Sequence, residues 1–263
     1  MTTPAGPYVR YAVDGGVATL TLDSPHNRNA ISTRLVAEFS QGLTEAAVDP
    51  AVRAVVLTHT GGTFCAGADL AEAAAGAGAA DPAQLAAERT QAMTTLLRSI
   101  VELPKPVVGR IDGHVRAGGM GLVGACDIVV AGPKCTFALT EARLGLAASI
   151  ISLTVLPRLT SRAASRYFLT GEKFGPAEAE RLGLVTVAAD DAVEVTAGIV
   201  EQLRLGSPQG LAESKALTTA ATLAAFDERA EGLAAQSARL FGTPEAMEGM
   251  MAFLQKRRPS WAQ

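Results

Sequence analysis

Hydrophobic residues in the first two thirds of the chain form short runs, and turns containing glycine or proline separate these runs. A run of four to eight apolar residues between turn signals is typical of a buried strand. Two of the runs are joined at Gly15-Gly16, which is a hairpin signal. The predicted strands span residues 8–14, 17–23, 52–58, 107–111, 128–130 and 184–188.

Helical periodicity alternates with these strands and then takes over the chain. Ser32 is expected to cap a helix in which Leu35, Phe39 and Leu43 recur at four-residue spacing. Residues 71–80 are rich in Ala and Gly and are expected to be mobile. Further helices are predicted at 82–101, 145–159, 161–169 and 176–182, followed by 192–205, 208–222, 223–241 and 244–256. This order predicts an α/β core with a C-terminal helical region, although the pattern does not distinguish a spiral from a doubly wound sheet.

The composition narrows the class of protein. The chain has 263 residues, of which 48% are hydrophobic and 19% charged, as in a well-buried globular protein. A net charge of −3 without a basic block argues against a nucleic-acid partner. No apolar run approaches the ~20 residues that span a bilayer, and the N-terminus lacks a signal-peptide pattern. Three cysteines without metal-ligand spacing indicate reduced thiols, so we expect a cytoplasmic protein that holds no metal.

Two glycine-rich stretches carry the candidate chemistry. Residues 58–70 and 113–145 each lead from an apolar strand through glycines into a helix. Such turns let backbone N–H groups converge at a helix N-terminus, where they stabilise developing negative charge. Glu141 follows the second stretch closely enough to lie across a small cavity from it. Together these parts suggest activation of a carbonyl group combined with proton transfer.

Residues 119–124 also match the GxGxxG pattern of dinucleotide-binding proteins. That interpretation requires the glycines to follow a strand directly and to open a βαβ unit. Here seven residues separate Ile111 from Gly119, and the motif lies in the middle of the chain. The context therefore argues against a nucleotide site.

Three segments, FCAGADL (64–70), AGGMGLVGACDIVVA (117–131) and TFALTEARLGL (136–146), resemble the enoyl-CoA hydratase/isomerase (crotonase) superfamily. The resemblance extends from about Ala12 to the QKRRPSW ending. It implies a crotonase-like spiral of ββα units over residues 1–195 and a helical oligomerisation region over 196–263. It also implies an acyl-CoA thioester substrate, with coenzyme A as part of that substrate and no separate cofactor.

The resemblance assigns the catalytic groups residue by residue. Ala68 and Gly118 match the positions whose N–H groups form the oxyanion hole. The alternative is that the two glycine-rich turns have no catalytic role and only allow the strands and helices to pack tightly. Glu141 matches the second catalytic glutamate of the hydratases, although a glutamate at a helix start also suits the helix dipole. At the position of the first glutamate this chain has Gly121. Ser149, where these hydratases tend to have glycine, could place a hydroxyl near the reacting water or simply start a helix.

The remaining candidates are substrate-binding residues. Ala66, Asp69 and Leu70 lie in the same motif as Ala68, and Asp69 is expected to cap the following helix rather than to react. The basic candidates for the CoA phosphates are Arg28, Lys256 and Arg257. A basic helix end also complements the helix dipole, so a structural role is the alternative for the last two.

His114 and Arg116, close to the second glycine turn, are kept as candidate pocket residues. No pattern among the histidines indicates a catalytic triad or a metal site.

These assignments predict hydration of a 2-enoyl-CoA, with Glu141 as the acid and base. The alternatives are a double-bond isomerase, which needs one base and no water, and an acyl-CoA binding protein with little activity. The last predicted helix carries Met247, Met250, Met251 and Leu254 on one stripe. We therefore expect a homotrimer or a hexamer made of two trimers, in which Lys256 or Arg257 approaches a CoA phosphate.

Overall fold

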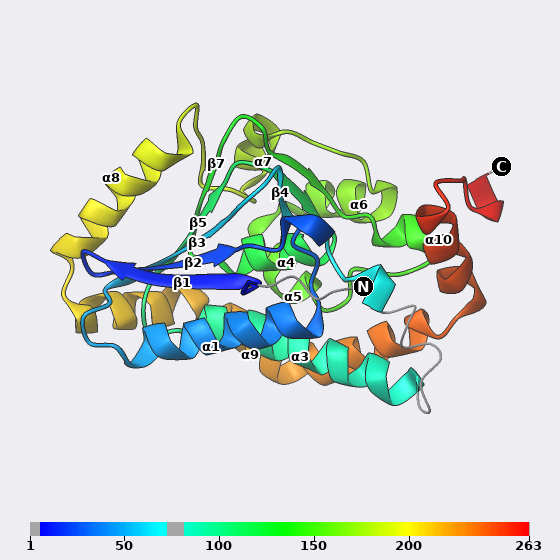
Figure 1. Ribbon diagram of the computed structural model, residues 1–263, viewed down its shortest axis with the longest axis horizontal. Coiled ribbons are helices and arrows are strands. Elements are labelled where there is room, and N and C mark those ends of the chain that lie inside the picture. Colours follow the sequence, from blue (N-terminus) through cyan, green and yellow to red (C-terminus); the bar gives the residue numbers. More distant parts are fainter. Residues whose placement is uncertain (1–5, 73–81, 263) are drawn as a thin grey trace.

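The computed structural model describes residues 6–72 and 82–262, which form two sheets wound into a spiral and a helical C-terminal region (Figure 1). The large sheet has the strand order β1-β2-β3-β5-β7-β9, and the small sheet has the order β4-β6-β8. Neighbouring strands are parallel except in the β1-β2 hairpin. The strands are β1 (Val9–Asp14), β2 (Val17–Leu22), β3 (Ala54–His59), β4 (Thr63–Cys65), β5 (Val107–Ile111), β6 (His114–Arg116), β7 (Ile128–Ala131), β8 (Thr136–Ala138) and β9 (Val187–Ala188).

Three turns of the spiral each give one strand to each sheet. The chain passes from β3 to β4, from β5 to β6 and from β7 to β8, and β6 leads directly into a helix, α4. This repeat confirms the α/β class. It also shows that the fold is a spiral of ββα units and not a doubly wound sheet. The short strands of the small sheet were not predicted, because three residues are too few to show a period of two.

The helices cover both faces of the large sheet. In Figure 1, α1, α3 and α9 lie together below the sheets, whereas α8 lies apart from them at the upper left. The helices are α1 (Thr33–Val48), α3 (Pro82–Glu102), α4 (Gly118–Ala125), α5 (Ser152–Val155), α6 (Ser161–Thr170), α7 (Pro176–Leu182), α8 (Ala192–Leu205), α9 (Pro208–Phe241) and α10 (Pro244–Leu254). Short 3₁₀ turns are η1 (Pro25–Asn27), η2 (Glu141–Leu144), η3 (Leu156–Arg158) and η4 (Ser260–Ala262).

The predicted amphipathic pattern of α1 is confirmed. The Ser32 hydroxyl oxygen accepts a hydrogen bond from the Leu35 N–H at 3.2 Å and caps the helix. Leu35, Phe39 and Leu43 are buried in the main core. A smaller cluster on the other face of the sheet joins Val56 to α8. The alternation of side chains along β3 thus supplies both cores.

The C-terminal helices differ from the prediction in one place. Residues 208–222 and 223–241 were expected to be two helices, but they form the single helix α9. Helix-forming residues such as Leu223 and Ala224 continue across the expected break without a proline or glycine, so nothing ends the helix there.

The predicted strand at 184–188 is reduced to β9 (Val187–Ala188). Gly183 ends α7 in the left-handed conformation, with a φ of 86°. The N–H groups of Leu184 and Val185 then donate to the Ala179 carbonyl. These donors close the helix end and are not available to a sheet.

The glycines of the GxGxxG pattern serve helix packing. A Cβ added at Gly121 would lie 2.5 Å from Ile151 Cγ2, and one added at Gly124 would lie 2.6 Å from the Thr154 carbonyl oxygen. The Thr154 hydroxyl also donates to the Gly121 carbonyl at 2.9 Å. These contacts let α4 and α5 approach closely, which accounts for Gly121 and Gly124 without a nucleotide.

Three expectations concern larger parts of the chain. The predicted mobile segment 71–80 lies, from residue 73 onward, outside the described residues. Within 6–72 and 82–262, no helix is long and apolar enough to cross a membrane. The division at residue 195 falls inside α8 and stays a prediction.

Candidate active site

The two glycine-rich turns lie against each other. The Gly67 carbonyl accepts a hydrogen bond from the Ile31 N–H at 2.8 Å, and Gly67 has a φ of 89°. A Cβ added at Gly67 would lie 2.8 Å from Ala117 Cβ and 3.4 Å from the Gly118 nitrogen. Ala68, in the first turn, and Gly118, in the second, are therefore brought together from positions fifty residues apart in the sequence.

The second turn holds a residue in an unusual backbone conformation. Ala117 has φ 47° and ψ −121°, a region that residues with a side chain rarely adopt. Its N–H donates to the Ala138 carbonyl at 3.0 Å, and its carbonyl accepts from the Met120 N–H at 2.8 Å. These two bonds keep the turn in place and fix the direction of the next N–H, that of Gly118.

Both predicted oxyanion donors are available. Gly118 is the first residue of α4, so its N–H has no partner within the helix. Ala68 is exposed, and the bridge between its segment and Ile31 is made by the Gly67 carbonyl and the Asp69 N–H. Across the described ranges, neither the Ala68 N–H nor the Gly118 N–H has a hydrogen-bond partner. Two adjacent unpaired N–H groups are what an oxyanion hole requires.

Glu141 leaves the same edge of the small sheet as the second turn. It begins η2 three residues after the end of β8, and β8 pairs in parallel with β6, which ends just before Ala117. The hydrogen bond from Ala117 to Ala138 joins the two segments. Because the carboxyl ends of parallel strands share one edge of a sheet, Glu141 lies on the side of the second glycine-rich turn. This turn, residues 117–119, is called the oxyanion turn below.

The environment of Glu141 favours proton transfer near neutral pH. Its Oε2 atom is shielded from solvent and has no hydrogen-bond partner among the described residues. This burial raises the pKa of Glu141 to about 7, opposed only by a hydrogen bond from its own backbone N–H. A carboxyl group with such a pKa can accept and return a proton at the pH of the cell.

The position of the missing first glutamate is enclosed by apolar side chains. Besides Ile151, the Leu97 side chain lies close to Gly121, with Cδ1 3.3 Å from an added Cβ. The immediate surroundings of Gly121 are therefore apolar.

Ser149 is buried, and its hydroxyl is already engaged. It donates to Gln236 Oε1 of α9 at 2.8 Å. Since a hydroxyl has one proton, Ser149 can offer a nearby water only its lone pairs. Gln236 was missed by the sequence analysis because no local pattern connects residues 87 positions apart.

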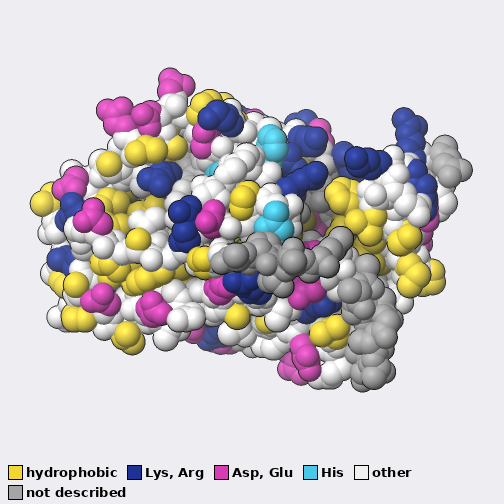
Figure 2. Space-filling view, viewed as in Figure 1, with side chains coloured by type: hydrophobic (Ala, Val, Ile, Leu, Met, Phe, Trp, Pro, Cys, Tyr) yellow, Lys and Arg dark blue, Asp and Glu magenta, His cyan; other side chains and the backbone are white. Residues whose placement is uncertain are grey.

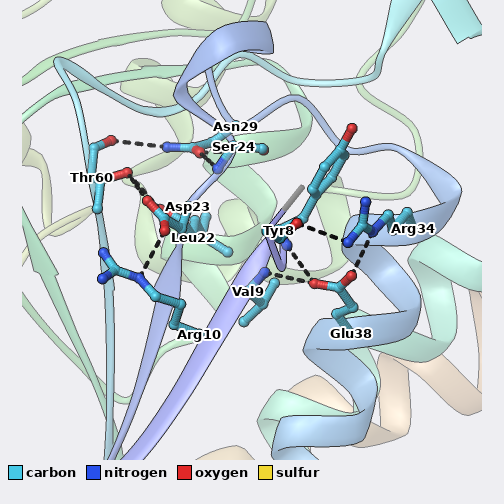
Figure 3. Close-up of polar contacts among 11 residues, drawn as sticks. Tyr8, Val9, Arg10, Leu22, Asp23, Ser24, Asn29, Arg34, Glu38 and Thr60 are labelled. Carbon is cyan, nitrogen blue, oxygen red and sulfur yellow. Dashed lines mark hydrogen bonds and ion pairs between the residues drawn. The ribbon is translucent and has the colours of Figure 1, made fainter. Parts of the chain in front are cut away.

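The loop that carries Arg28 is held against the first turn. The Arg28 carbonyl accepts a hydrogen bond from the Ala66 N–H at 3.2 Å. The buried Asn29 accepts from the Ser24 N–H at 2.7 Å and donates to the carbonyls of Thr60 and Thr63, as Figure 3 shows for Ser24 and Thr60. The Arg28 side chain is exposed, and no ion pair within the described ranges engages it.

Asp69 acts as expected for a helix cap. Its Oδ1 atom accepts hydrogen bonds from the N–H groups of Ala71 and Glu72, each at 3.1 Å. Its Oδ2 atom accepts from Asn27 Nδ2 at 3.1 Å, which ties the cap to the loop of Arg28. Leu70, the next residue, is half-buried.

The C-terminal basic residues differ from each other. Arg257 forms a two-pronged ion pair with Glu248, with both nitrogen–oxygen distances at 2.6 Å. Its guanidinium is therefore occupied. Lys256 is exposed, and within the described residues it has no ion pair. Figure 2 shows Lys and Arg side chains gathered in the upper right of the view, extending toward α10.

Two apolar residues at the oxyanion turn were not predicted. A Cβ added at Gly118 would lie 2.8 Å from Ile31 Cδ1 and 3.8 Å from Met93 Cε. Ile31 and Met93 come from distant segments and carry no motif, so only the fold reveals them. As for metals, the part of the chain that the structure describes contains no cluster of His, Cys, Asp or Glu able to hold one.

The fold and the site together define a protein able to stabilise negative charge on a carbonyl oxygen and to move a proton beside it. Residues 12–263 match the family model described as enoyl-CoA hydratase/isomerase. A solved enoyl-CoA hydratase from Mycobacterium avium is 59% identical, with a TM-score of 0.89 over 97% of this chain and 98% of that one.

Two other relatives cover nearly the same length. A protein of Thermus thermophilus, provisionally named an enoyl-CoA hydratase, is 32% identical over 93% of this chain and 97% of its own. A mevalonyl-coenzyme A hydratase of Aspergillus fumigatus is also 32% identical, over 93% and 91% respectively. The chain belongs to the enoyl-CoA hydratase/isomerase family, which supports a hydratase-type enzyme acting on acyl-CoA thioesters.

Proposed function

We propose that this chain is a hydro-lyase that adds water across the double bond of a 2-enoyl-CoA. The observation that carries the proposal is the buried carboxyl of Glu141 on the same side of the small sheet as two unpaired backbone N–H groups. The Ala68 and Gly118 N–H groups would hold the thioester oxygen. The negative charge that forms on this oxygen when water adds to the β-carbon would be stabilised there.

In this proposal Glu141 is the only acid and base. Its carboxylate removes a proton from water as the oxygen bonds to the β-carbon, and an enolate forms on the thioester. The protonated carboxyl then gives its proton to the α-carbon, which restores the carbonyl and the carboxylate. A pKa of about 7 suits both steps, because the group accepts and releases the proton with similar ease.

A panel of enoyl-CoA thioesters tests the proposal. Wild-type protein and Glu141→Gln are incubated with 2-enoyl-CoAs in water labelled with ¹⁸O, and products are followed by chromatography and mass. We expect a 3-hydroxyacyl-CoA that carries the label only with the wild-type protein. If no 2-enoyl-CoA of any chain length is hydrated, the hydratase proposal is wrong.

A second candidate, double-bond isomerisation, is favoured by the apolar surroundings of Gly121. Moving a proton between the α- and γ-carbons needs one base and no water, and Ile151 and Leu97 leave the Gly121 side without a second carboxylate. The same panel separates the two, since a 3-enoyl-CoA would become a 2-enoyl-CoA of unchanged mass. Binding of CoA esters without either product would instead support the weakly active binding protein.

We further propose that the protein is a homotrimer or a dimer of trimers and that it is cytoplasmic. Ala246, Gly249 and Ala252 of α10 face its own chain, whereas apolar side chains on the helix and just beyond it are exposed. Figure 2 shows hydrophobic side chains at the right end of the molecule, over α10. The exposed residues are Met247, Met251, Phe253, Leu254 and Trp261.

A further inference from the structure

Arg116 ends β6, on the outer face of the small sheet. Its neighbour Val115 points into the core and is buried, whereas Arg116 is half-buried and His114 is exposed. Arg116 Nη1 donates to the carbonyls of Val115 and Thr136, at 2.8 and 2.5 Å, and Nη2 donates to Thr136 Oγ1 at 2.7 Å. The guanidinium is thus fixed in direction by the two strands that it joins.

Part of this guanidinium remains open. An arginine has five N–H donors, and three of those of Arg116 are used. The Nε–H and one Nη2–H remain, and Nε is not among the buried atoms that lack a partner, so it retains solvent access. In this protein the Nε and Nη2 atoms of Arg181 together bind the carboxylate of Glu178. The open pair on Arg116 is therefore the fork that grips an oxyanion with two parallel hydrogen bonds.

The charge of Arg116 also has no counter-ion. None of the ion pairs between described residues includes it, and partial burial lowers the pKa of its guanidinium. Partly removing a cation from water without a counter-ion costs free energy, which an anionic ligand would offset. Asp112, which precedes β6, pairs with Lys134, so that carboxylate does not fill this role.

The position of Arg116 connects it to the substrate site. One residue, Ala117, separates it from Gly118, and its own carbonyl oxygen lies 3.3 Å from a Cβ added at Gly67. Thr63 of β4 pairs with His114 of β6, and the Arg28 loop is anchored on β4. The backbone of Arg116 therefore lies beside the oxyanion turn. Its guanidinium reaches across to Thr136 of β8, one strand spacing or roughly 4.8 Å away, on the side of β6 opposite β4.

We propose that the open fork of Arg116 binds an oxyanion of the acyl-CoA, at a subsite of its own on the β6–β8 side of the small sheet, on the strand that leads into the oxyanion turn. This inference rests on the proposed function, because it takes an acyl-CoA as the ligand. Two parts of such a ligand offer the required chemistry: the phosphates of the CoA portion, and a carboxylate on an acyl group that carries one. Arg257, which the sequence put forward for this task, has its guanidinium occupied by Glu248.

Calorimetric binding with unreactive, saturated ligands tests the subsite. Wild-type protein, Arg116→Gln and Arg116→Lys are titrated with butyryl-CoA, butyryl-pantetheine and succinyl-pantetheine. Loss of a charged two-pronged contact should weaken binding roughly 10- to 100-fold in Arg116→Gln. Arg116→Lys should lose less, because it keeps the charge without the fork.

The three ligands distinguish the source of the oxyanion. A loss on butyryl-CoA that disappears with butyryl-pantetheine identifies a CoA phosphate. A loss confined to succinyl-pantetheine identifies an acyl carboxylate. Two results would overturn the proposal. An equal loss of affinity for all three ligands would show that Arg116 has a purely structural role, and unchanged affinity for all three would show that it contacts none of them.

Arg110→Gln is the matched control. Arg110 is also a half-buried strand arginine without an ion pair among the described residues, but it lies on β5, in the other sheet. The Arg110→Gln variant should bind all three ligands with wild-type affinity. If its affinity falls as much as that of Arg116→Gln, the effect is due to net charge and the proposed subsite is wrong. Circular dichroism and thermal melting check that each variant is folded. If Arg116→Gln is not folded, the binding comparison is made with Arg116→Lys.

The outcome is separable from that of the proposed function. If the wild-type protein hydrates a 2-enoyl-CoA and Arg116→Gln binds all ligands normally, only the subsite proposal is wrong. If the wild-type protein binds no acyl-CoA, both the subsite proposal and the proposed function are wrong.

Discussion

The side chain of Ile151 stands directly against the α-carbon of Gly121, so that a β-carbon added there would lie 2.5 Å from Ile151 Cγ2. A glutamate at position 121 would therefore meet Ile151 and Leu97 before it reached a substrate. We predict that Gly121→Glu alone lowers hydration and reduces stability, because overpacking of a core costs about 1–3 kcal/mol. Steady-state kinetics and urea unfolding measure the two effects.

The double variant Gly121→Glu/Ile151→Ala distinguishes a steric effect at position 121 from an effect of the added charge. Replacing Ile151 by Ala as well removes the side chain that blocks position 121, so the double variant should hydrate 2-enoyl-CoA faster than Gly121→Glu alone. Ile151→Ala in the wild-type background is the control for the cavity. If the double variant is no faster than the single one, steric exclusion by Ile151 is not what keeps a second carboxylate out.

Glu141→Gln should reduce turnover by roughly 10²–10⁴, the usual effect of losing a positioned acid or base. Binding of butyryl-CoA should stay within a few-fold of wild type, because the amide has the shape of the acid and the oxyanion turn is untouched. Single-turnover kinetics and calorimetry test the two halves of this prediction. A variant that retains most of its turnover would shift the acid–base role to another residue.

The pH dependence of hydration should follow the pKa of Glu141. The carboxylate form activates water, so kcat/KM for 2-enoyl-CoA should rise with pH through about 7 and then level off. A pH profile measured from 5 to 9 checks this. A profile that levels off already at pH 5 would mean that Glu141 is not the group that limits the rate.

The same pKa links Glu141 to stability. Its value in the folded protein is raised from 4.5 to about 7, so the folded state binds the proton more tightly than the unfolded state. The resulting cost is absent well below pH 4.5, grows between 4.5 and 7 and stays constant above 7. Glu141→Gln should therefore be more stable than wild type at pH 8, by an amount on the order of 3 kcal/mol, and this gain should largely vanish near pH 4.

Gly118→Pro tests the oxyanion hole when it is compared with Gly118→Ala. Both variants place a Cβ 2.8 Å from Ile31 Cδ1, but only proline lacks the N–H. The ratio of their kcat values should reach about 10²–10³, as expected for one lost oxyanion donor. Circular dichroism must show that both are folded. Equal kcat values in two folded variants would exclude the Gly118 N–H as a donor.

The exposed apolar side chains of α10 should lie in an interface. Phe253→Asp is expected to lower the molecular mass seen by light scattering, since a charge would be buried between chains. Val48→Asp, on the exposed side of α1, is the control and should leave the mass unchanged. If wild type is already a single chain, or Phe253→Asp keeps its mass, the assembly proposal is wrong for this surface.

Local patterns proved reliable where one physical rule dominates. The periodicity of Leu35, Phe39 and Leu43 and the cap at Ser32 predicted α1, and the glycine at 183 with the proline at 176 bounded α7. They were unreliable where hydrogen bonds are settled by distant partners. The strand expected from residue 184 lost its first donors to the end of α7, and the small sheet could not be seen in runs of three residues.

The sequence by itself determined the family and the α/β class, and it proposed Ala68, Gly118 and Glu141 as the reacting groups, because these assignments depend on motifs of adjacent residues. Only the tertiary structure decided how these residues are surrounded. The filling of the Gly121 side by Ile151, the occupation of Arg257 by Glu248 and the open fork of Arg116 all involve partners that are distant along the chain or on another strand. Burial, free hydrogen-bond donors and unpaired charge are properties of packing in three dimensions, and no local pattern of residues encodes them.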